Sequence, residues 1–396
     1  MGKQPPRGVT VLLMAQIASQ MGDAAFAVLL LWAVVERTDS RLVLGAAATL
    51  NYLPILLFGM AGGLAADRFP RRGLMVASDG ARALLSLSVP VLALGGLDTP
   101  WILAAMGFGL FTASAFFNPA RDATIPFLAR GGDLVRANAL IQLSVPLGWL
   151  LGPAACLLFL QWFPTVELFA GVGLLFAVSV AFLLVLPAEP AAPKGSARIA
   201  KALFEGLEVI RRDPRLRVLM AITAADNLLI MGPAIVGTPL FAKTVLGGGG
   251  GTYALLEASL ALGALAGIPL AARLTLRFGQ GWVLIGGIFL DGITYLPLLW
   301  VRSPWAAALA VGLHGVSIPL ITVTRTAFIQ RVVPPERMGR VFAITGMMVL
   351  GLTALSSGLT GLVTTVVPVP VVFGAIAVLA ALCGPAAALS RDFREA

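Results

Sequence analysis

The chain has 396 residues, of which 58% are hydrophobic and only 12% are charged. A soluble domain is about one quarter charged, so this composition excludes a soluble enzyme with one large core and indicates a protein that crosses a membrane repeatedly. The formal net charge of +9 would suggest nucleic acid binding in a soluble protein, but we attribute it to basic cytoplasmic loops and expect no nucleic acid partner.

Twelve apolar segments are separated by short polar loops, and each is long enough to cross a bilayer. The basic stretch that precedes the first segment leads directly into it, so we predict a retained first span and no cleaved signal peptide. We predict an all-α polytopic membrane protein with twelve transmembrane helices in two pseudo-repeated six-helix bundles. The predicted spans are 9–35, 43–65, 74–95, 101–120, 137–160, 166–187, 218–241, 252–272, 281–301, 304–325, 341–364 and 368–389.

The longest break between apolar segments lies between residues 188 and 217. It ends in an amphipathic run on which Leu203, Leu207 and Ile210 are expected to form a face that lies at the membrane interface. We therefore predict an N-terminal bundle at 1–187, a cytoplasmic linker with an amphipathic helix at 188–217 and a C-terminal bundle at 218–396.

Lysine and arginine are concentrated in alternate loops, on the side that also carries both ends of the chain. Basic residues near membrane spans are retained in the cytoplasm, so this asymmetry predicts that both termini are cytoplasmic. The exceptions, which fall on the opposite side, are Arg37, Arg41, Lys243 and Arg302.

The two halves of the chain repeat each other at a nearly constant offset. Asp23 and Asp226 are 203 residues apart, and Gly63 and Gly267 are 204 apart. Six plus six spans with parallel repeats is the plan of a secondary transporter whose substrate site lies between the halves. Two arginine pairs share the offset of 204: Arg121 with Arg325, and Arg136 with Arg340.

The first predicted span carries an acid within apolar sequence. Gln16, Ser19, Gln20 and Asp23 recur at helical spacing and form a polar stripe on one face. A polar residue inside a membrane helix faces a cavity or a partner helix, and an ionisable one suggests a proton or ion site. Asp23 is therefore the first candidate for proton coupling or for binding a substrate cation. The alternative is a structural hydrogen bond to a neighbouring span.

Further ionisable residues lie within later spans. Asp226, followed by Asn227, either forms a two-carboxylate proton site with its repeat partner Asp23 or is a structural copy of the same helix contact. Glu257 and Asp291 are acids in apolar sequence, and His314 titrates near neutral pH in its ordinary state. For each of them the alternative is a structural or packing role. Asp79 and Arg82 are three residues apart, and we expect them to pair on one helix face.

Residues 63–73 form a short charged loop between the second and third spans, which must leave the bilayer. We predict a cytoplasmic gate in which Asp67 meets a helix N-terminus or Arg121, and basic side chains satisfy helix carbonyls. Arg121 and Arg325 have Asp67, Asp122 and Glu336 as alternative partners. The second half has no counterpart of Asp67. The other reading is a plain topogenic loop with snorkelling arginines. The gate candidates are Gly63, Asp67, Arg68, Arg71, Arg72, Arg121, Arg325 and Arg340.

The fifth predicted span contains Gly148, Gly152 and Pro153. Small residues let two helices approach closely, and a proline removes a backbone hydrogen bond and bends its helix. The alternative is ordinary glycine packing in a glycine-rich membrane protein.

Several of these motifs resemble those of the major facilitator superfamily, over essentially the whole chain. The stretch Gly63-x-x-x-Asp67-Arg68-x-Pro70-Arg71-Arg72 resembles the family's signature in loop 2–3, although that signature usually has Gly at the position of Pro70. The run Gly148-x-x-x-Gly152-Pro153 resembles the antiporter motif, whose bend the resemblance assigns to sealing the site against leak. Three stretches resemble the branch of macrolide and siderophore exporters, to which lysophospholipid transporters are close: 118–121, 137–140 and 334–341.

We predict a secondary active transporter that exports amphiphilic small molecules, such as drugs, macrolides or siderophores, by proton antiport with alternating access. The alternatives are a lysophospholipid or other lipid transporter and, in another class, a transporter-like sensor or scaffold. We expect no enzyme activity, and ATP-driven pumping is disfavoured because the sequence has no Gly-x-x-x-x-Gly-Lys-Ser/Thr loop.

One histidine and two cysteines leave no ligand set for a zinc site. We expect no metal or organic cofactor, and we expect the proton gradient to supply the energy. The expected partners are an amphiphilic or lipid substrate, protons and the bilayer. We expect a monomer in a bacterial inner (cytoplasmic) membrane that contributes to antibiotic resistance.

Overall fold

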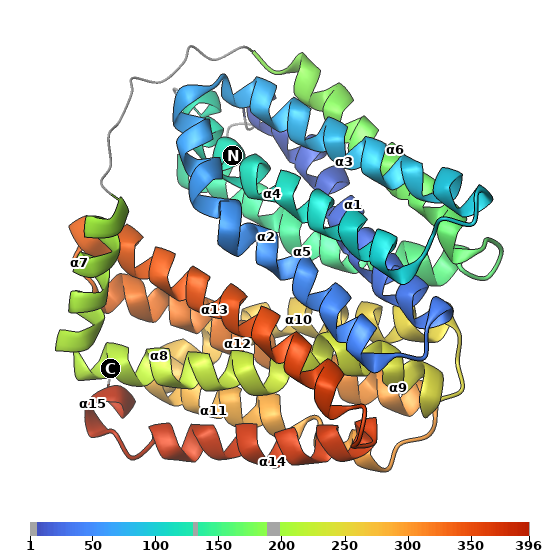
Figure 1. Cartoon of the computed structure of the whole chain (residues 1–396). Helices are drawn as coiled ribbons and strands as arrows, with labels where there is room; N and C mark the ends of the chain where they lie inside the picture. Colours follow the sequence, from blue (N-terminus) through green and yellow to red (C-terminus); the bar gives the residue numbers. More distant parts are fainter. Residues whose placement is uncertain (1–5, 130–133, 188–198, 396) are drawn as a thin grey trace. The chain divides into compact units, whose positions relative to one another are not determined.

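A computed structural model describes residues 6–129, 134–187 and 199–395 of the chain (Figure 1). Within these ranges every regular element is a helix, and twelve helical segments are long and apolar enough to cross a membrane. The predicted fold class is therefore confirmed. The chain divides into two compact units, one of residues 1–39 and 50–195 and the other of residues 40–49 and 196–396.

The first unit is built from six membrane-spanning helices, of which α2 begins in residues that are grouped with the second unit. The shortest of the six has 21 residues, which at a rise of about 1.5 Å per residue matches a hydrocarbon core of about 30 Å. The helices are α1 (Arg7–Arg37), α2 (Arg41–Arg68), α3 (Arg71–Leu94), α4 (Pro100–Leu128), α5 (Leu134–Phe159) and α6 (Thr165–Val185).

Helix α1 is the most enclosed helix of the first unit, with 78% of its membrane window buried against 39% or less for α2 to α6. It packs against α4, α5 and α6, and α3 packs against α4 and α6. A helix that is surrounded by protein has no lipid-facing side, so its polar residues must meet other helices. This enclosure brings the polar stripe of α1 into contact with the rest of the unit.

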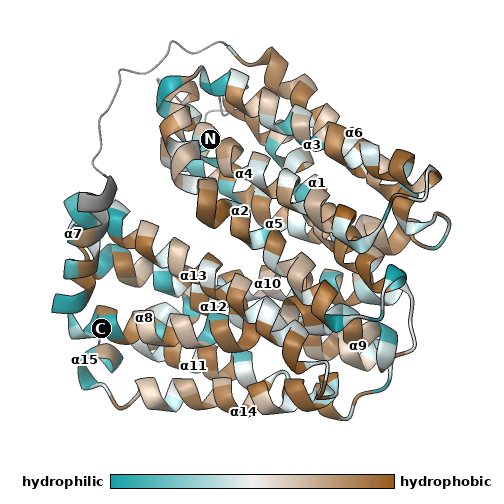
Figure 2. Cartoon of the chain, in the orientation of Figure 1, coloured by the Kyte–Doolittle hydropathy of each residue, from teal (hydrophilic) through white to brown (hydrophobic). Residues whose placement is uncertain are grey.

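The second unit holds the other six spans and two short helices that do not cross. Figure 2 shows hydrophobic residues along the spanning helices and hydrophilic residues on α7 and α15. The elements are α7 (Ile199–Arg212), α8 (Pro214–Asp226), η1 (Asn227–Met231), η2 (Pro233–Gly237), α9 (Thr238–Thr244), α10 (Gly250–Phe278), α11 (Gln280–Ile293), η3 (Leu296–Leu299), α12 (Pro304–Val332), α13 (Pro335–Val363), α14 (Val369–Ala387) and α15 (Arg391–Arg394).

The seventh span is not a uniform α-helix, because two π-helical segments, η1 and η2, lie between α8 and α9. The hydroxyl of Ser356 on α13 inserts here: it accepts a hydrogen bond from the backbone N–H of Gly232 at 2.8 Å and donates one to the carbonyl of Leu228 at 2.7 Å. A Cβ at position 232 would lie 2.2 Å from the carbonyl oxygen of Ser356. Glycine is therefore needed for this approach, and Ser356 satisfies backbone groups that the wider helix leaves open.

Helix α7 runs across the end of the second unit (Figure 1) and packs against α13. Glu205 forms an ion pair with Arg340 on α13. The prediction that Ile210 lies on an interfacial face is wrong. Leu207 is exposed, but Ile210 is buried in the core of the second unit, because one side of α7 has to cover that core. The side chain of Leu203 lies outside the described residues.

Asp213 links α7 to α8 and caps the latter. Its side chain accepts a hydrogen bond from the backbone N–H of Arg215 at 2.8 Å, as is common at helix N-termini. The guanidinium of Arg215 also donates to this carboxylate, at 2.7 Å, and this bond holds the pKa of Asp213 below its ordinary value. The turn into the seventh span is thus fixed by local charge.

Candidate functional site

Five polar residues, one of them a buried arginine, meet within the first unit. This Arg82 network consists of Asp79 and Arg82 on α3, Ser19 and Asp23 on α1, and Ser179 on α6. The Nη1 atom of Arg82 lies 3.1 Å from Oδ1 of Asp79 and 3.5 Å from Oδ2 of Asp23. The predicted pairing of Asp79 with Arg82 is confirmed.

Asp79 is held on all sides. Besides its contact with Arg82, it accepts hydrogen bonds from the hydroxyl of Ser19 at 3.2 Å and from that of Ser179 at 2.5 Å. Its side chain is completely buried, and a buried carboxylate is tolerated only when it is paired and hydrogen-bonded. Asp79 is therefore the fixed counter-ion of Arg82.

The guanidinium of Arg82 is 1% exposed and lies against aromatic rings. Its central carbon is 4.8 Å from the ring centroid of Phe117 and 5.5 Å from that of Phe176, so both rings offer cation–π contacts. Its Nε and Nη2 atoms have no hydrogen-bond partner within the part of the chain that the structure describes. Its ion pairs with Asp79 and Asp23 are therefore both made by Nη1.

Asp23 is the looser member of the network. Its side chain is 15% exposed, whereas that of Asp79 is fully buried, and its contact with Arg82 is 0.4 Å longer than that of Asp79. The more distant charge of Arg121 also acts on it. Two carboxyl groups thus share one close cation, and Asp23 is the one that can change its charge while Asp79 and Arg82 stay paired.

The remaining polar residues of the α1 stripe do not join the Arg82 network. Gln16 is fully buried, and neither atom of its amide group has a hydrogen-bond partner among the described residues. Gln20 is 8% exposed and lies against α5, where a Cβ at Gly148 would be 2.5 Å from the Cβ of Gln20.

The glycines of α5 bring its backbone onto α1 beside Asp23. A Cβ at Gly152 would lie 2.8 Å from the backbone nitrogen of Ala25 and 2.9 Å from the carbonyl oxygen of Met21. The sequence prediction of close helix approach at Gly148 and Gly152 is therefore confirmed. Pro153 lies inside α5, directly after this contact.

We expect Gly152→Leu to destabilise the protein by at least about 1–3 kcal/mol, the usual cost of overpacking. The new side chain would meet backbone atoms of α1, which cannot rotate away, and the displaced α1 would move Asp23. Gly171→Leu on α6 is the matched control, because a Cβ there meets nothing within 4 Å. The midpoint of thermal unfolding in detergent measures both. Equal midpoints for the two variants would contradict the tight contact.

The charged loop after α2 differs from its predicted arrangement. Arg121, which is 8% exposed, contacts Asp122 through Nε at 2.8 Å and does not pair with Asp67. Asp67 and Arg68 are exposed. The ionic latch between Asp67 and Arg121 is therefore not formed, because Arg121 is satisfied by the acid next to it in the chain.

Two arginines of this loop bind carbonyl groups near the ends of other helices, as predicted for the basic cluster. Arg71 donates to the carbonyl of Ala123 on α4 at 2.7 Å, and Arg72 donates to the carbonyl of Leu184 on α6. The loop thus ties the start of α3 to the ends of its neighbours. A Cβ at Gly63 would meet nothing within 4 Å, so no close contact requires glycine at this position.

The second unit contains a separate buried group, the Asp291 cluster, made of Asp226 on α8, Asp291 on α11, and His314 and Ser317 on α12. Nδ1 of His314 lies 3.3 Å from Oδ1 of Asp291, and the hydroxyl of Ser317 donates to the same carboxylate. The charge of Asp291 also acts on Asp226. All four residues are at most 8% exposed.

The other predicted residues of the second unit are spread around this cluster. Asn227 is buried, donates to the carbonyl of Thr223 at 2.8 Å and accepts from Thr353 at 3.4 Å. It therefore holds the seventh span to α13. Tyr253, one turn earlier, acts on Glu257, and Arg325 acts on Asp226 through its charge.

Two serines that complete these clusters were not predicted from the sequence. Ser179 and Ser317 were not singled out, although Ser179 is an isolated hydroxyl in the middle of the strongly apolar α6. A lone polar residue in an apolar membrane helix indicates a contact with another helix, and this pattern could have identified Ser179.

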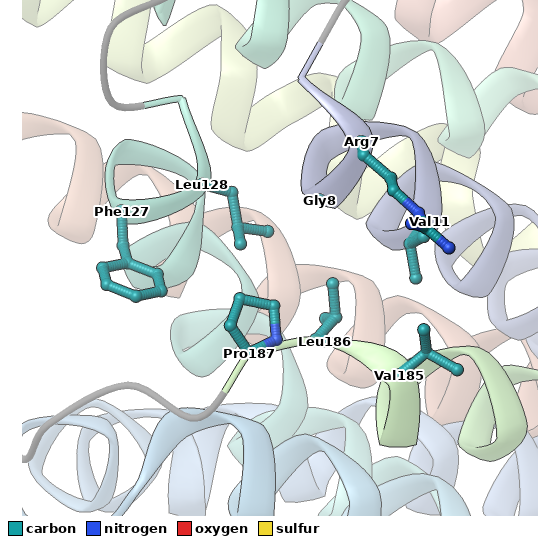
Figure 3. Close-up of a pocket in the computed structure, with 8 residues that line it drawn as sticks. All are labelled: Arg7, Gly8, Val11, Phe127, Leu128, Val185, Leu186 and Pro187. Atoms are coloured by element: carbon teal, nitrogen blue, oxygen red, sulfur yellow. The ribbon is translucent and has the colours of Figure 1, made fainter.

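Two cavities lie apart from these clusters. One of about 520 Å³ lies in the first unit between the start of α1 and the ends of α4 and α6, and Figure 3 shows the residues around it. A smaller, mostly apolar cavity of about 260 Å³ lies in the second unit between the seventh span, α13 and α14. Neither is lined by Asp23, Asp79, Asp226 or Asp291.

A family profile described as "Transmembrane secretion effector" matches residues 7–394. A macrolide efflux protein A of Streptococcus pyogenes is 25% identical over 340 residues, which cover 84% of this chain and 83% of the relative. One of Enterococcus faecalis is 26% identical over 307 residues, or 75% of this chain and 93% of the relative. The crystal structure of the nucleoside transporter NupG superposes with a TM-score of 0.75 at 14% identity, covering 96% of this chain and 98% of that one.

Proposed function

Because the chain belongs to the transmembrane secretion effector family of major facilitator transporters, we propose that it exports amphiphilic small molecules by proton antiport with alternating access. It is a multi-pass membrane transporter and not an enzyme. The relatives named as macrolide efflux proteins support drug export as its activity. They give no support to the lipid-transport and sensor alternatives.

The proposal that Asp23 couples transport to protons rests on the composition of the Arg82 network, which has two carboxyl groups and one guanidinium. Asp79 neutralises Arg82, so Asp23 binds and releases a proton without leaving the guanidinium unpaired. In the deprotonated state Asp23 adds a negative charge to an otherwise balanced site, and this charge attracts either a substrate cation or a new proton. Binding of one in exchange for the other is the elementary step of antiport.

The cargo is held mainly by apolar contact, as suits an amphiphile, and the charged loop after α2 serves as the gate at the cytoplasmic end. In this proposal Asp67 and Arg68 remain free to make and break contacts, while Arg71 and Arg72 anchor the loop to α4 and α6. The transporter works as a monomer in a bacterial inner membrane with both termini in the cytoplasm. It needs no cofactor beyond the proton gradient.

Transport by purified protein in lipid vesicles tests this proposal. Vesicles with an acidic interior should accumulate a labelled macrolide and a cationic dye faster than vesicles without a pH gradient, because protons leaving the vesicle drive uptake through inside-out molecules. A protonophore should remove the difference, and protein-free vesicles give the leak rate. Uptake at the same rate with and without the gradient would contradict proton antiport. Uptake no faster than the leak would contradict export of these compounds.

A further inference from the structure

The cavity of about 520 Å³ between the start of α1 and the ends of α4 and α6 has a fixed inner wall and an open rim. Leu128 and Leu186 form part of the inner wall, are 8% and 2% exposed, and belong to a packed hydrophobic core of the first unit. Val185 lies at the rim and is 64% exposed. Because Val185 ends a helix long and apolar enough to cross the membrane, the rim faces lipid. The volume is within the range of about 300–1,000 Å³ that ligand sites occupy.

The lining of this cavity combines one cation with apolar side chains. Among the lining residues that the structure describes, Arg7 is the one charged residue, and the others are apolar or glycine. Figure 3 shows these residues gathered from three segments of the chain. Arg7 is exposed and forms no ion pair with any residue that the structure describes. Its charge is therefore available to a ligand.

A second guanidinium lies beside the rim. Arg72, at the start of α3, donates a hydrogen bond to the carbonyl of Leu184, which directly precedes the rim residue Val185. The acid of α4, Asp122, is already paired with Arg121 at 2.8 Å. The mouth of the cavity thus carries positive charge, while its inner wall is apolar.

We propose that this cavity binds an anionic phospholipid, whose phosphate contacts Arg7 and whose acyl chain lies against Val11, Phe127 and Leu186. A guanidinium binds phosphate through two parallel hydrogen bonds, and basic pockets between membrane helices bind anionic headgroups. A water-soluble anion satisfies Arg7 but leaves the apolar wall uncovered. A lipid satisfies both parts of the site, and it reaches the rim from the membrane itself.

This site is separate from the one proposed for proton coupling. Asp23 lies 16 residues beyond Arg7 on the same helix, or about 24 Å at a rise of 1.5 Å per residue. The cavity is formed wholly by residues of the first unit. Lipid binding there joins the ends of α1, α4 and α6, and a ligand that binds only the folded protein raises its unfolding temperature. The inference therefore does not rest on the proposed export function, and its test needs no transport.

Lipid titration of the full-length protein in detergent tests the site. Dioleoyl-phosphatidylglycerol should raise the midpoint of thermal unfolding and remain bound in native mass spectrometry. Dioleoyl-phosphatidylcholine has the same chains but no net charge, and it should bind more weakly. Glycerol 3-phosphate has the phosphate but no chain, and it should leave the midpoint unchanged.

Three variants locate the binding. Arg7→Gln should weaken binding of phosphatidylglycerol about fivefold, as expected for one basic residue at the membrane surface. Arg273→Gln is the matched control, because Arg273 is an exposed arginine near the end of α10 in the other unit, and it should leave the affinity unchanged. Val11→Phe fills part of the space assigned to the acyl chain and should weaken binding of both lipids.

The proposal is overturned if the two lipids bind equally, or if Arg7→Gln and Arg273→Gln have the same effect. Stabilisation by glycerol 3-phosphate alone would make this a site for a soluble anion. Stabilisation by a macrolide that is lost in Val11→Phe would make it a cargo site, and either result rejects the lipid. If Val11→Phe does not fold, Arg7→Glu still decides, because it should reverse the preference between the two lipids and an unchanged preference contradicts the site.

Discussion

In vesicles that carry the Asp23→Asn variant, an acidic interior should no longer accelerate uptake of the cargo. Asparagine keeps the size and polarity of the side chain but can neither bind nor release a proton. The Asp79–Arg82 pair remains intact, so the network stays neutral and the helices remain packed. Exchange of an uncharged cargo down its own gradient should therefore continue at a rate close to that of the unmodified protein, while the gradient-driven component is lost.

Measuring gradient-driven uptake and cargo exchange separately distinguishes a loss of proton coupling from a general loss of transport. Glu167→Gln is the matched control, because Glu167 is an exposed acid in the first turn of α6, outside the Arg82 network. It should keep full acceleration by the gradient. If Asp23→Asn also keeps that acceleration, Asp23 is not the coupling residue. If both rates disappear for an uncharged cargo with a normal unfolding midpoint, Asp23 is needed for movement of the cargo itself and its role is not confined to coupling.

Arg82→Met should destabilise the protein by about 3–5 kcal/mol, the usual cost of removing one partner of a buried ion pair. Methionine fills much of the space against Phe117 and Phe176 but leaves Asp79 fully buried without a cation. The low dielectric of the membrane interior increases this penalty. We expect a lower yield of folded protein and a reduced free energy of unfolding in denaturant titrations.

Two further variants show whether the unpaired buried charge of Asp79 causes the destabilisation by Arg82→Met. Asp79→Asn combined with Arg82→Met removes both charges of the closest pair and should cost less than Arg82→Met alone. Arg37→Met breaks an ion pair with Asp98 in which both side chains are 21% exposed, and it should cost about 0–1 kcal/mol. Equal destabilisation by Arg37→Met and Arg82→Met would mean that burial of the charge does not matter.

The membrane spans could be predicted from the sequence because the physics that defines them is local. A run of apolar residues and its charged ends determine where a helix enters and leaves the bilayer, and all twelve predicted spans are found. The same is true of the Asp79–Arg82 pair, since three residues along one helix bring both side chains to the same face. The glycines of α5 were also informative, because few other roles explain two small residues one turn apart.

The partners across helices could not be predicted in this way. The sequence offered Asp67, Asp122 and Glu336 as partners of Arg121 without deciding between them, and in the structure Arg121 pairs with Asp122. It associated Asp226 with Asp23 through the repeat, whereas in the structure the charge of Asp291 acts on Asp226. Asp291 has no counterpart at the same offset. Serine hydroxyls such as those of Ser179 and Ser317 are too common to mark a contact until the helices that bring them together are known.

The π-helical segments of the seventh span have a consequence for how the two halves are aligned. Asp23 and Asp226 are 203 residues apart, but Gly63 and Gly267 are 204 apart, so the second half has one more residue between these landmarks. A π-turn closes its hydrogen bond over five residues instead of four, and η1 and η2 can absorb an inserted residue without shifting either end of the span. Residues of the first half therefore match residues of the second half at an offset of 203 up to residue 226 and at an offset of 204 at Gly267. Substitutions that compare equivalent positions in the two halves must use the offset that applies to each stretch.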